Sequence, residues 1–421
     1  MRDDHAEAAP ADRRRWRLIA LIAVAALSVA SLARLAAGAS DGVDSGALRI
    51  VAEEEREDAL PSAPATAPRR GLDDAARSAN ALPPAGGVWR DLPPAPLQTP
   101  ARHAAVWTGR ELVAVGADGA AAYDPDAERW RALPAVPDEL HWPLAVAWTG
   151  REVLVWGNVD PRGEAEAHGA RYEPASGRWR RTAWLDIDLG PWPVAVWAGD
   201  RLLVWGAGDV VAYDPRADAW QRLSAPPLQR AGPAKAAWTG SDVVIWGDAA
   251  TPGARRGRAG FTVAYDPARD RWRALPPPPV AGEAGTPVWT GQEVVVLGGQ
   301  DLRQRNVFPD SADLPAGAAL DPRSGIWRVI GAPPGFGTPA RMEQLFGLAV
   351  AWTGEAVVAV GGYPEGAGLL YDPAADRWSA LPSGPVDLVH GAGAWTGEEF
   401  LVWGGYGPLG PHVGLAAWEP R

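Results

Sequence analysis

A unit that repeats seven times between residues 89 and 421 constrains this chain more than any other feature. Each copy carries a Trp-Thr-Gly motif or a close variant and then a Tyr-Asp-Pro motif or a close variant, and the two alternate strictly along the chain. A repeat of several tens of residues indicates one supersecondary unit that packs on its neighbours to build a shared core. The first motif places its tryptophan at Trp107, Trp148, Trp197, Trp238, Trp289, Trp352 and Trp395.

A second tryptophan follows six of the seven Asp-Pro motifs or their variants, usually with Arg after it. Six copies stand in order, but the seventh, Trp89, precedes the first complete unit, and the last unit ends shortly after Trp418 without one. Because these two incomplete units complement each other, we expect the strand at Trp89 to pair with the strand that ends near Trp418. These second tryptophans are Trp89, Trp130, Trp179, Trp220, Trp272, Trp327 and Trp378.

Each unit reads as four short strands. Small apolar residues lead into Trp-Thr-Gly, whose Gly suits a tight turn with positive φ. A nearly all-apolar strand follows, as at 112–115 and 243–246, which indicates burial of both faces between neighbouring sheets. Asp-Pro ends the third strand, because Pro cannot continue the ladder. The sequence therefore predicts an all-β, seven-bladed β-propeller of four-stranded antiparallel blades, closed by the N-terminal outer strand joining the three C-terminal strands.

Composition agrees with that class and excludes several functions. The chain has 49 Gly, 42 Pro and 23 Trp, which is typical of a turn-rich β protein with a Trp-built core. A net charge of −11 argues against nucleic acid as a partner. Because the chain has no Cys, it cannot form a disulfide, a thiol nucleophile or a thiolate metal site.

Residues 1–39 carry the pattern of a signal peptide or membrane anchor. Four arginines at positions 13–17 precede an apolar run over 18–33, and small residues follow at 37–39. As a helix the run spans roughly 24 Å, which is short of the ~30 Å hydrocarbon core. The segment is therefore either a cleaved signal peptide or an uncleaved membrane anchor. The arginines are compatible with export by either the Sec or the twin-arginine route. Residues 40–87 read as a disordered Pro/Ala/acidic linker and 88–421 as the propeller. We expect the propeller to be extracytoplasmic, secreted or tethered, with the membrane reached only through the N-terminal segment.

From about residue 89 to 421 the repeats resemble kelch repeats of the galactose-oxidase central-domain type, in which a Gly doublet is followed by Tyr and then Trp. The doublet is present in three units and reduced to one Gly in four. The resemblance implies a bacterial secreted kelch-like propeller. Galactose oxidase holds copper with a Tyr crosslinked to Cys, so a chain without Cys cannot build that cofactor. Other similar propellers isomerise acidic sugars with a His, Arg and Glu set near the central channel. The doublets are Gly298-Gly299, Gly361-Gly362 and Gly404-Gly405.

The longer connections all fall on one face of the predicted ring, and variable loops on a rigid scaffold are where binding usually lies. Many residues there are basic although the chain is acidic, which favours an anionic or polyhydroxylated ligand. The alternative is that these are ordinary solvated side chains. The predicted ligand-binding residues are Arg102, His103, His141, Arg230, Arg341, Glu343, His390, Arg303 and Arg305. The same face also carries Lys235, Arg255, Arg256, Arg258, Asn158 and Tyr406.

Three of these histidines, His103, His141 and His390, precede the inner strands of ring neighbours. Either these histidines converge to form a metal-binding or acid–base cluster, or each simply forms hydrogen bonds with the backbone. The chain has no nucleophile elbow, phosphate-binding loop or His-Glu-x-x-His, so we assign no catalytic residue, metal or cofactor. The leading hypothesis is a monomeric module that binds a protein or a carbohydrate at the cell surface and is not an enzyme. The alternative is a carbohydrate-processing enzyme such as an acidic-sugar epimerase or mutarotase.

Overall fold

The computed structural model of the protein describes residues 84–97, 103–116, 118–137, 143–157, 168–190, 193–206, 208–227, 230–249, 259–279, 285–298, 316–334, 347–361, 367–382, 384, 390–407, 410–411 and 414–421. The predicted signal peptide or anchor and most of the predicted linker lie outside these residues. Among the residues described, no helix has the length and apolar character needed to cross a membrane.

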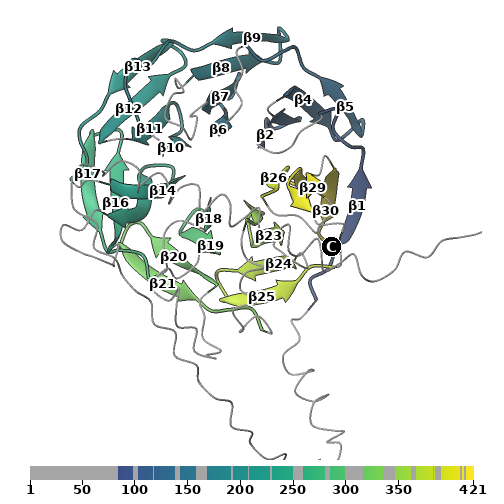
Figure 1. The fold of residues 1–421 in the computed structure, drawn as a ribbon. Coiled ribbons are helices and arrows are strands. Elements are labelled where there is room, and N and C mark those ends of the chain that lie inside the picture. Colours follow the sequence, from purple (N-terminus) through teal and green to yellow (C-terminus); the bar gives the residue numbers. More distant parts are fainter. Residues whose placement is uncertain are drawn as a thin grey trace, which may run out of the picture. The chain divides into compact units, whose positions relative to one another are not determined.

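Seven four-stranded antiparallel sheets are arranged as blades around a ring (Figure 1). Blade one consists of β2 (His103–Trp107), β3 (Leu112–Gly116), β4 (Gly119–Asp124) and β5 (Arg129–Ala132). Blade two consists of β6 (Pro143–Trp148), β7 (Val153–Gly157), β8 (His168–Glu173) and β9 (Arg178–Arg181). Blade three consists of β10 (Val194–Trp197), β11 (Leu202–Gly206), β12 (Asp209–Asp214) and β13 (Ala219–Arg222). Blade four consists of β14 (Arg230–Trp238), β15 (Val243–Ala249), β16 (Ala259–Asp266) and β17 (Arg271–Leu275). Blade five consists of β18 (Thr286–Trp289), β19 (Val294–Leu297), β20 (Gly317–Asp321) and β21 (Ile326–Ile330). Blade six consists of β22 (Ala349–Trp352), β23 (Val357–Gly361), β24 (Ala367–Asp372) and β25 (Arg377–Ala380). Blade seven is β26 (Ala392–Trp395), β27 (Phe400–Trp403), β30 (Leu415–Glu419) and β1 (Val88–Leu92), beside a small pair formed by β28 (Tyr406–Gly407) and β29 (Gly410–Pro411).

The two ends of the repeat region close the ring. Strand β1 pairs antiparallel with β30, so that Trp89 lies opposite Trp418 and Leu92 opposite Leu415. The innermost strands contact one another in the order β2, β6, β10, β14, β18, β22 and β26, and β26 contacts β2 again. The predicted all-β, seven-bladed propeller and its closure by the first strand are therefore confirmed.

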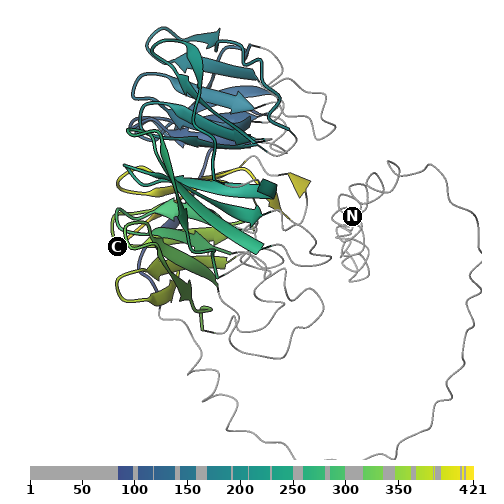
Figure 2. The ribbon, with the colours of Figure 1, turned by 90° about the vertical axis from the view of Figure 1, so that its left-hand side faces the viewer.

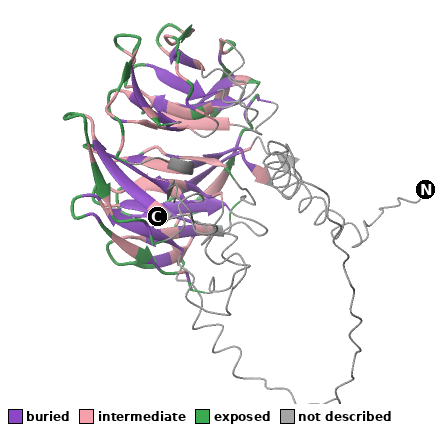
Figure 3. Cartoon of the chain, turned by 60° about the vertical axis from the view of Figure 1, so that its left-hand side comes forward, coloured by how far each residue is buried: buried purple, intermediate pink, exposed green. Residues whose placement is uncertain are grey.

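The hydrophobic core lies in the seams between blades. Every residue of the second strands β3, β7 and β11 is buried, as their unbroken apolar sequences predicted. Each core cluster joins two neighbours; Leu112 and Tyr123 of blade one, for example, pack with Leu401 and Trp403 of blade seven. Full burial of one such aliphatic side chain contributes about 1.5–3 kcal/mol. Figure 3 shows the buried residues running through the sheets and the exposed ones gathered at turns and outer strands.

The second tryptophan of each repeat joins its blade to the preceding one. Its indole N–H donates to a backbone carbonyl just beyond the outer strand of that blade, at 2.7 to 3.0 Å in all seven cases. The ring also packs on the aromatic residue of its own blade, as between Tyr123 and Trp130, whose ring centroids are 5.3 Å apart. These contacts explain why the repeat keeps Trp here, since neither Phe nor Tyr has a ring N–H to donate. The pairs are Trp89–Pro382, Trp130–Pro93, Trp179–Pro134, Trp220–Ala183, Trp272–Ser224, Trp327–Pro276 and Trp378–Gly331.

Candidate functional site

The strand order gives the ring two different faces. The Thr-Gly turns and the Asp-Pro turns emerge together on what we call the short-turn face, which lies along the left-hand side of Figure 2. Thr108 shows how these turns are built: its hydroxyl accepts the N–H of Glu111 at 3.0 Å and donates to the carbonyl of the same residue at 2.9 Å. Connections between blades begin and end on the opposite, long-loop face.

Paired charges hold the seam between blades five and six on the short-turn face. Arg328 donates to both carboxylate oxygens of Glu293, at 3.0 and 2.7 Å, and to the hydroxyl of Tyr371 in the next blade at 2.7 Å. Tyr371 donates in turn to Asp376. The hydrogen bonds with Glu293 are the main reason that the pKa of Arg328 is raised. We call this arrangement, a carboxylate after the Thr-Gly turn bound by an arginine that reaches the next blade, the seam clamp.

Related clamps recur at other seams. Arg131 binds Glu111 and donates to the hydroxyl of Tyr172 at 3.2 Å. Arg90 of the closing strand pairs with Glu399 at 2.7 Å, so the clamp also spans the junction of the chain ends. Two further pairs are Arg171–Glu152 and Arg273–Asp242.

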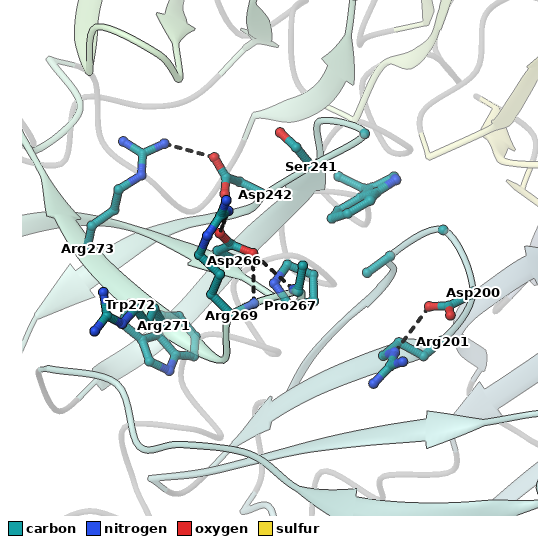
Figure 4. Close-up of a pocket in the computed structure, with 15 residues that line it drawn as sticks. Asp200, Arg201, Ser241, Asp242, Asp266, Pro267, Arg269, Arg271, Trp272 and Arg273 are labelled. Atoms are coloured by element: carbon teal, nitrogen blue, oxygen red, sulfur yellow. Dashed lines mark hydrogen bonds and ion pairs between the residues drawn. The ribbon is translucent and has the colours of Figure 1, made fainter.

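The seam between blades three and four departs from this pattern. Ala198 replaces the turn Thr, Arg201 stands where five other blades carry a carboxylate, and Gln221 replaces the clamp arginine. A groove of about 1060 Å³ lies at this seam on the short-turn face (Figure 4). Trp238 and Trp272 supply its apolar lining.

The groove's carboxylates are neutralised locally. Figure 4 shows Arg201 turned toward Asp200 on one side and Arg273 toward Asp242 on the other, at 3.1 and 2.9 Å. Arg269 binds Asp266, chiefly through a hydrogen bond that lowers the pKa of that carboxyl. A polar groove whose carboxylates are already paired with arginines offers little for a metal ion. It is an accessible surface, and no charge in it is buried without a partner.

The long-loop end of the ring axis holds a second feature, formed by Lys235, His103 and His390. They stand three, four and five residues before the repeat tryptophans of blades four, one and seven. Lys235 lies within β14, paired with Trp246, and His103 begins β2. Because the inner strands are aligned around the ring, all three residues lie near the same end of the axis.

Packing fixes both histidines. The ring of His103 meets Trp403 edge-on, with ring centroids 5.0 Å apart. His390 adopts a left-handed backbone conformation with φ 61°, held by its N–H donating to the carbonyl of Gly347 at 2.7 Å. Its imidazole covers Gly347, where an added Cβ would lie 3.1 Å from the ring. Such a strained backbone costs of order 1–3 kcal/mol and is found preferentially at functional sites.

The three residues interact electrostatically. Burial is the main cause that lowers the pKa of His390, and the positive charges of Lys235 and His103 add to it. Blades four and seven are not ring neighbours, so the interaction between Lys235 and His390 crosses the axis. His390 is exposed to solvent, yet protein surrounds it closely enough to disfavour its charged form.

The chain has 40 Lys and Arg residues in total, and Lys235 is the only lysine among them. It is only partly exposed, and burial alone lowers its pKa. Within the part of the chain that the structure describes, it forms no hydrogen bond or ion pair. The equivalent position in the other blades is occupied by Ala104, Ala145, Val194, Thr286, Ala349 and Ala392. A single desolvated amine therefore stands in a ring of small residues, which marks it as a candidate site.

Only part of the predicted ligand-binding set can be placed. His103 lies close enough to His390 for its charge to lower the pKa of His390. Arg230 begins β14. The described residues include no group of three or more His, Asp or Glu arranged to hold a metal ion. Outside the described residues lie Arg102, His141, Arg303, Arg305, Arg341 and Glu343, whose role stays a prediction.

Two features were missed by reasoning from the sequence, although each leaves a signal there. Lys235 was grouped with the loop arginines, but its being the only lysine sets it apart. The groove lies on the face expected to carry only short turns, and its signal is the substitution of Ala198 and Arg201 in an otherwise regular motif.

No protein-family model matches the chain, and no curated protein sequence matches it either. The closed ring of seven four-stranded blades defines its class, that of the seven-bladed β-propellers. Propellers commonly serve as interaction modules, so the site rather than the fold has to indicate the ligand.

Proposed function

We propose that this protein is an extracytoplasmic, kelch-like binding module whose ligand is a carboxylated sugar held at the long-loop end of the ring axis by Lys235, His103 and His390. The observation that carries the proposal is Lys235, a desolvated amine with no carboxylate partner among the described residues. A buried charge without a partner costs stability. A ligand carboxylate supplies the missing partner.

The charge distribution supports an anionic ligand. The chain has a net charge of −11, so a basic group at the axis stands out from an acidic background and attracts anions locally. An ammonium group binds a carboxylate through short, charge-assisted hydrogen bonds, and an imidazole N–H donates to a carboxylate in either charge state. Sugars with a carboxylate are abundant outside the cytoplasmic membrane, where the arginine-flanked apolar run at 18–33 would send the chain.

Thermal shift with matched sugars tests the ligand. Glucuronate and glucose differ in one carboxylate, so we expect only glucuronate to raise the unfolding midpoint of the full chain. Lys235→Met removes the amine and should abolish that shift. Arg271→Met changes an exposed cation on the short-turn face and should leave it intact. An equal response to both sugars, or an unchanged response in Lys235→Met, contradicts the proposal.

A second candidate, an acidic-sugar epimerase or mutarotase, is favoured by one observation. Burial is the main cause that lowers the pKa values of both Lys235 and His390, which favours their neutral forms, and the two residues act across one axis, as an acid and a base on opposite sides of a bound sugar would. NMR exchange spectroscopy of the glucuronate anomers distinguishes the two functions. A binder leaves the interconversion rate unchanged, whereas a mutarotase accelerates it in proportion to protein concentration.

The extracytoplasmic location needs its own test. We expect protease added to intact cells to degrade the propeller, while a cytoplasmic control protein survives. Protection of the propeller until the cells are lysed contradicts the location without affecting the sugar site.

A further inference from the structure

We propose that the outer edge of blade five is a self-association surface, at which strand β21 pairs antiparallel with β21 of a second copy of this chain. This surface is separate from the proposed sugar site and does not depend on it. Two rings joined in this way form a dimer, in place of the monomer expected from the sequence.

The first observation is the sequence of β21. Two positions of each outer strand are compared: the residue before the second tryptophan and the residue two places after it. In every blade except blade five, at least one of the two is charged. In blade five they are Ile326 and Val329, which are 66% and 52% exposed. Charge on an edge strand is a common means of preventing another strand from adding there. The charged residues of the other blades are Arg129, Arg178, Arg181, Arg222, Arg271, Arg377 and Asp91.

The second observation is the open backbone edge of β21. The strand is the last of its sheet and lies on the outer rim of the ring (Figure 1). The carbonyl of Ile330 accepts the N–H of Ala316, which directly precedes β20, at 2.9 Å. Since successive residues of a strand direct their N–H and C=O groups to alternate sides, the backbone groups of Trp327 and Val329 point away from β20. An added strand satisfies such groups with main-chain hydrogen bonds.

The third observation is that a neighbouring outer edge is already covered. The N–H of Ala85 donates to the carbonyl of Ala380 in β25 at 2.7 Å, and Pro84 forms a parallel bridge with the same residue. Ala380 occupies in blade six the position that Val329 occupies in blade five. The outer edges of this ring therefore accept an added backbone segment.

The edge of β21 is complementary to itself. When two copies pair about a two-fold axis at Arg328, Trp327 of each copy lies opposite Val329 of the other, and aromatic and β-branched residues form favourable cross-strand pairs. The two Arg328 side chains meet near the axis, but each is paired with Glu293 at 2.7 Å and with Asp376 at 3.3 Å, which offsets their repulsion. Because the other six outer strands all carry charge at the compared positions, association stops at two copies.

Crosslinking through an introduced thiol tests the proposal. Since the chain has no Cys, Val329→Cys supplies the only thiol of the full-length protein, and a short bismaleimide joins two copies only where those thiols are close. The matched control is Ala274→Cys, at the equivalent exposed position of blade four beside Arg271. We expect several-fold more covalent dimer from Val329→Cys. Its yield should rise with concentration, because a strand of five residues forms a small interface. Equal yields from the two variants overturn the proposal.

Restoring charge at the edge gives a second test. Ile326→Arg introduces the residue that four other blades carry at this position, so the fold should tolerate it, but it brings like charges together at the paired strands. In the Val329→Cys background we expect it to reduce the dimer several-fold and to leave the response to glucuronate the same as in the parent. An unchanged yield of dimer places the contact elsewhere, and the proposal is then wrong.

Sedimentation equilibrium of the wild-type chain, in detergent matched to the density of the solvent, needs no variant to fold. We expect the particle mass to rise from one chain to two as the concentration increases, and Ile326→Arg to return it to one. A mass of one chain at every concentration, or a mass that grows beyond two chains without a plateau, overturns the proposal.

Discussion

At the short-turn face of the seam between blades five and six, Arg328 lies between Glu293 and Tyr371, and its pKa is raised. At the long-loop end of the axis, Lys235 lies at a position that other blades fill with small residues, and its pKa is lowered. The clamp pairs its cation within the fold, while the axis leaves its cation without a partner among the described residues. The clamps use charge for architecture, whereas we propose that the axis keeps a charge for a ligand.

The largest effect is expected from opening the ring, because clamps and axis both depend on closure. Gly87 has φ +119°, and an added Cβ would lie 2.5 Å from the carbonyl oxygen of Glu419. We expect Gly87→Ala to lower the free energy of unfolding by about 3 kcal/mol or more. Gly109 has φ +88° with nothing within 4 Å, so Gly109→Ala should cost only about 1 kcal/mol. Equal losses in denaturant titrations would show that the closing contact is not critical.

Breaking one clamp comes next. Arg328→Met removes the contacts with Glu293 and Tyr371 and should lower the free energy of unfolding by about 1 kcal/mol, since the pair is partly exposed and screened. The matched control is Ser379→Ala, at the equivalent position of blade six, where Ala356 replaces the carboxylate and no clamp forms. We expect no measurable change there. A similar loss in both variants would mean that the clamp contributes nothing specific.

Removing the amine of Lys235 should raise the stability of the protein, whereas the two changes above lower it. Lys235→Met keeps the apolar stem and deletes a desolvated charge, so we expect the free energy of unfolding to rise by on the order of 1 kcal/mol near neutral pH. The folded pKa of Lys235 lies below 10.5, so the wild-type chain gains stability as pH rises through that folded pKa toward 10.5. The extra stability of Lys235→Met over the wild type should therefore decrease over the same pH range. If Lys235→Met is less stable than the wild type at neutral pH, the interpretation of Lys235 as an unpaired charge is wrong.

The smallest effect concerns acid stability. The hydroxyl of Tyr265 donates to Asp270 at 2.8 Å and is the main cause that lowers the pKa of that carboxyl. Stability from this bond is present above the unfolded pKa near 3.8 and is lost as pH falls through the lower folded value. Tyr265→Phe should reduce that acid loss by less than about 0.5 kcal/mol, because the carboxylate of Asp270 is exposed and screened by solvent. Tyr172→Phe is the control, since Gly177 replaces the acid there; an equal change in both variants contradicts the assignment.

The sequence predicted the ring because its signals are local and periodic. Unbroken apolar strands such as 112–116 indicated burial of both faces, and the displaced Trp89 indicated its pairing with Trp418. The seam contacts were not predictable, because the carbonyl that receives each indole N–H lies in another blade and carries no side-chain signature. The approach of Lys235 to His390 likewise depends on the diameter of the ring, which no repeat motif encodes.

Lys235 is a desolvated amine with no carboxylate partner among the described residues, and we propose that a ligand carboxylate is its partner. Growth on lysine labelled with ¹³C at Cε gives one lysine resonance for the whole chain, because the sequence contains one lysine. We predict that this resonance titrates with a midpoint below the ordinary 10.5 and that glucuronate moves the midpoint upward, since the bound carboxylate favours the charged form. A midpoint at or above 10.5 that does not respond to glucuronate would contradict the proposed site.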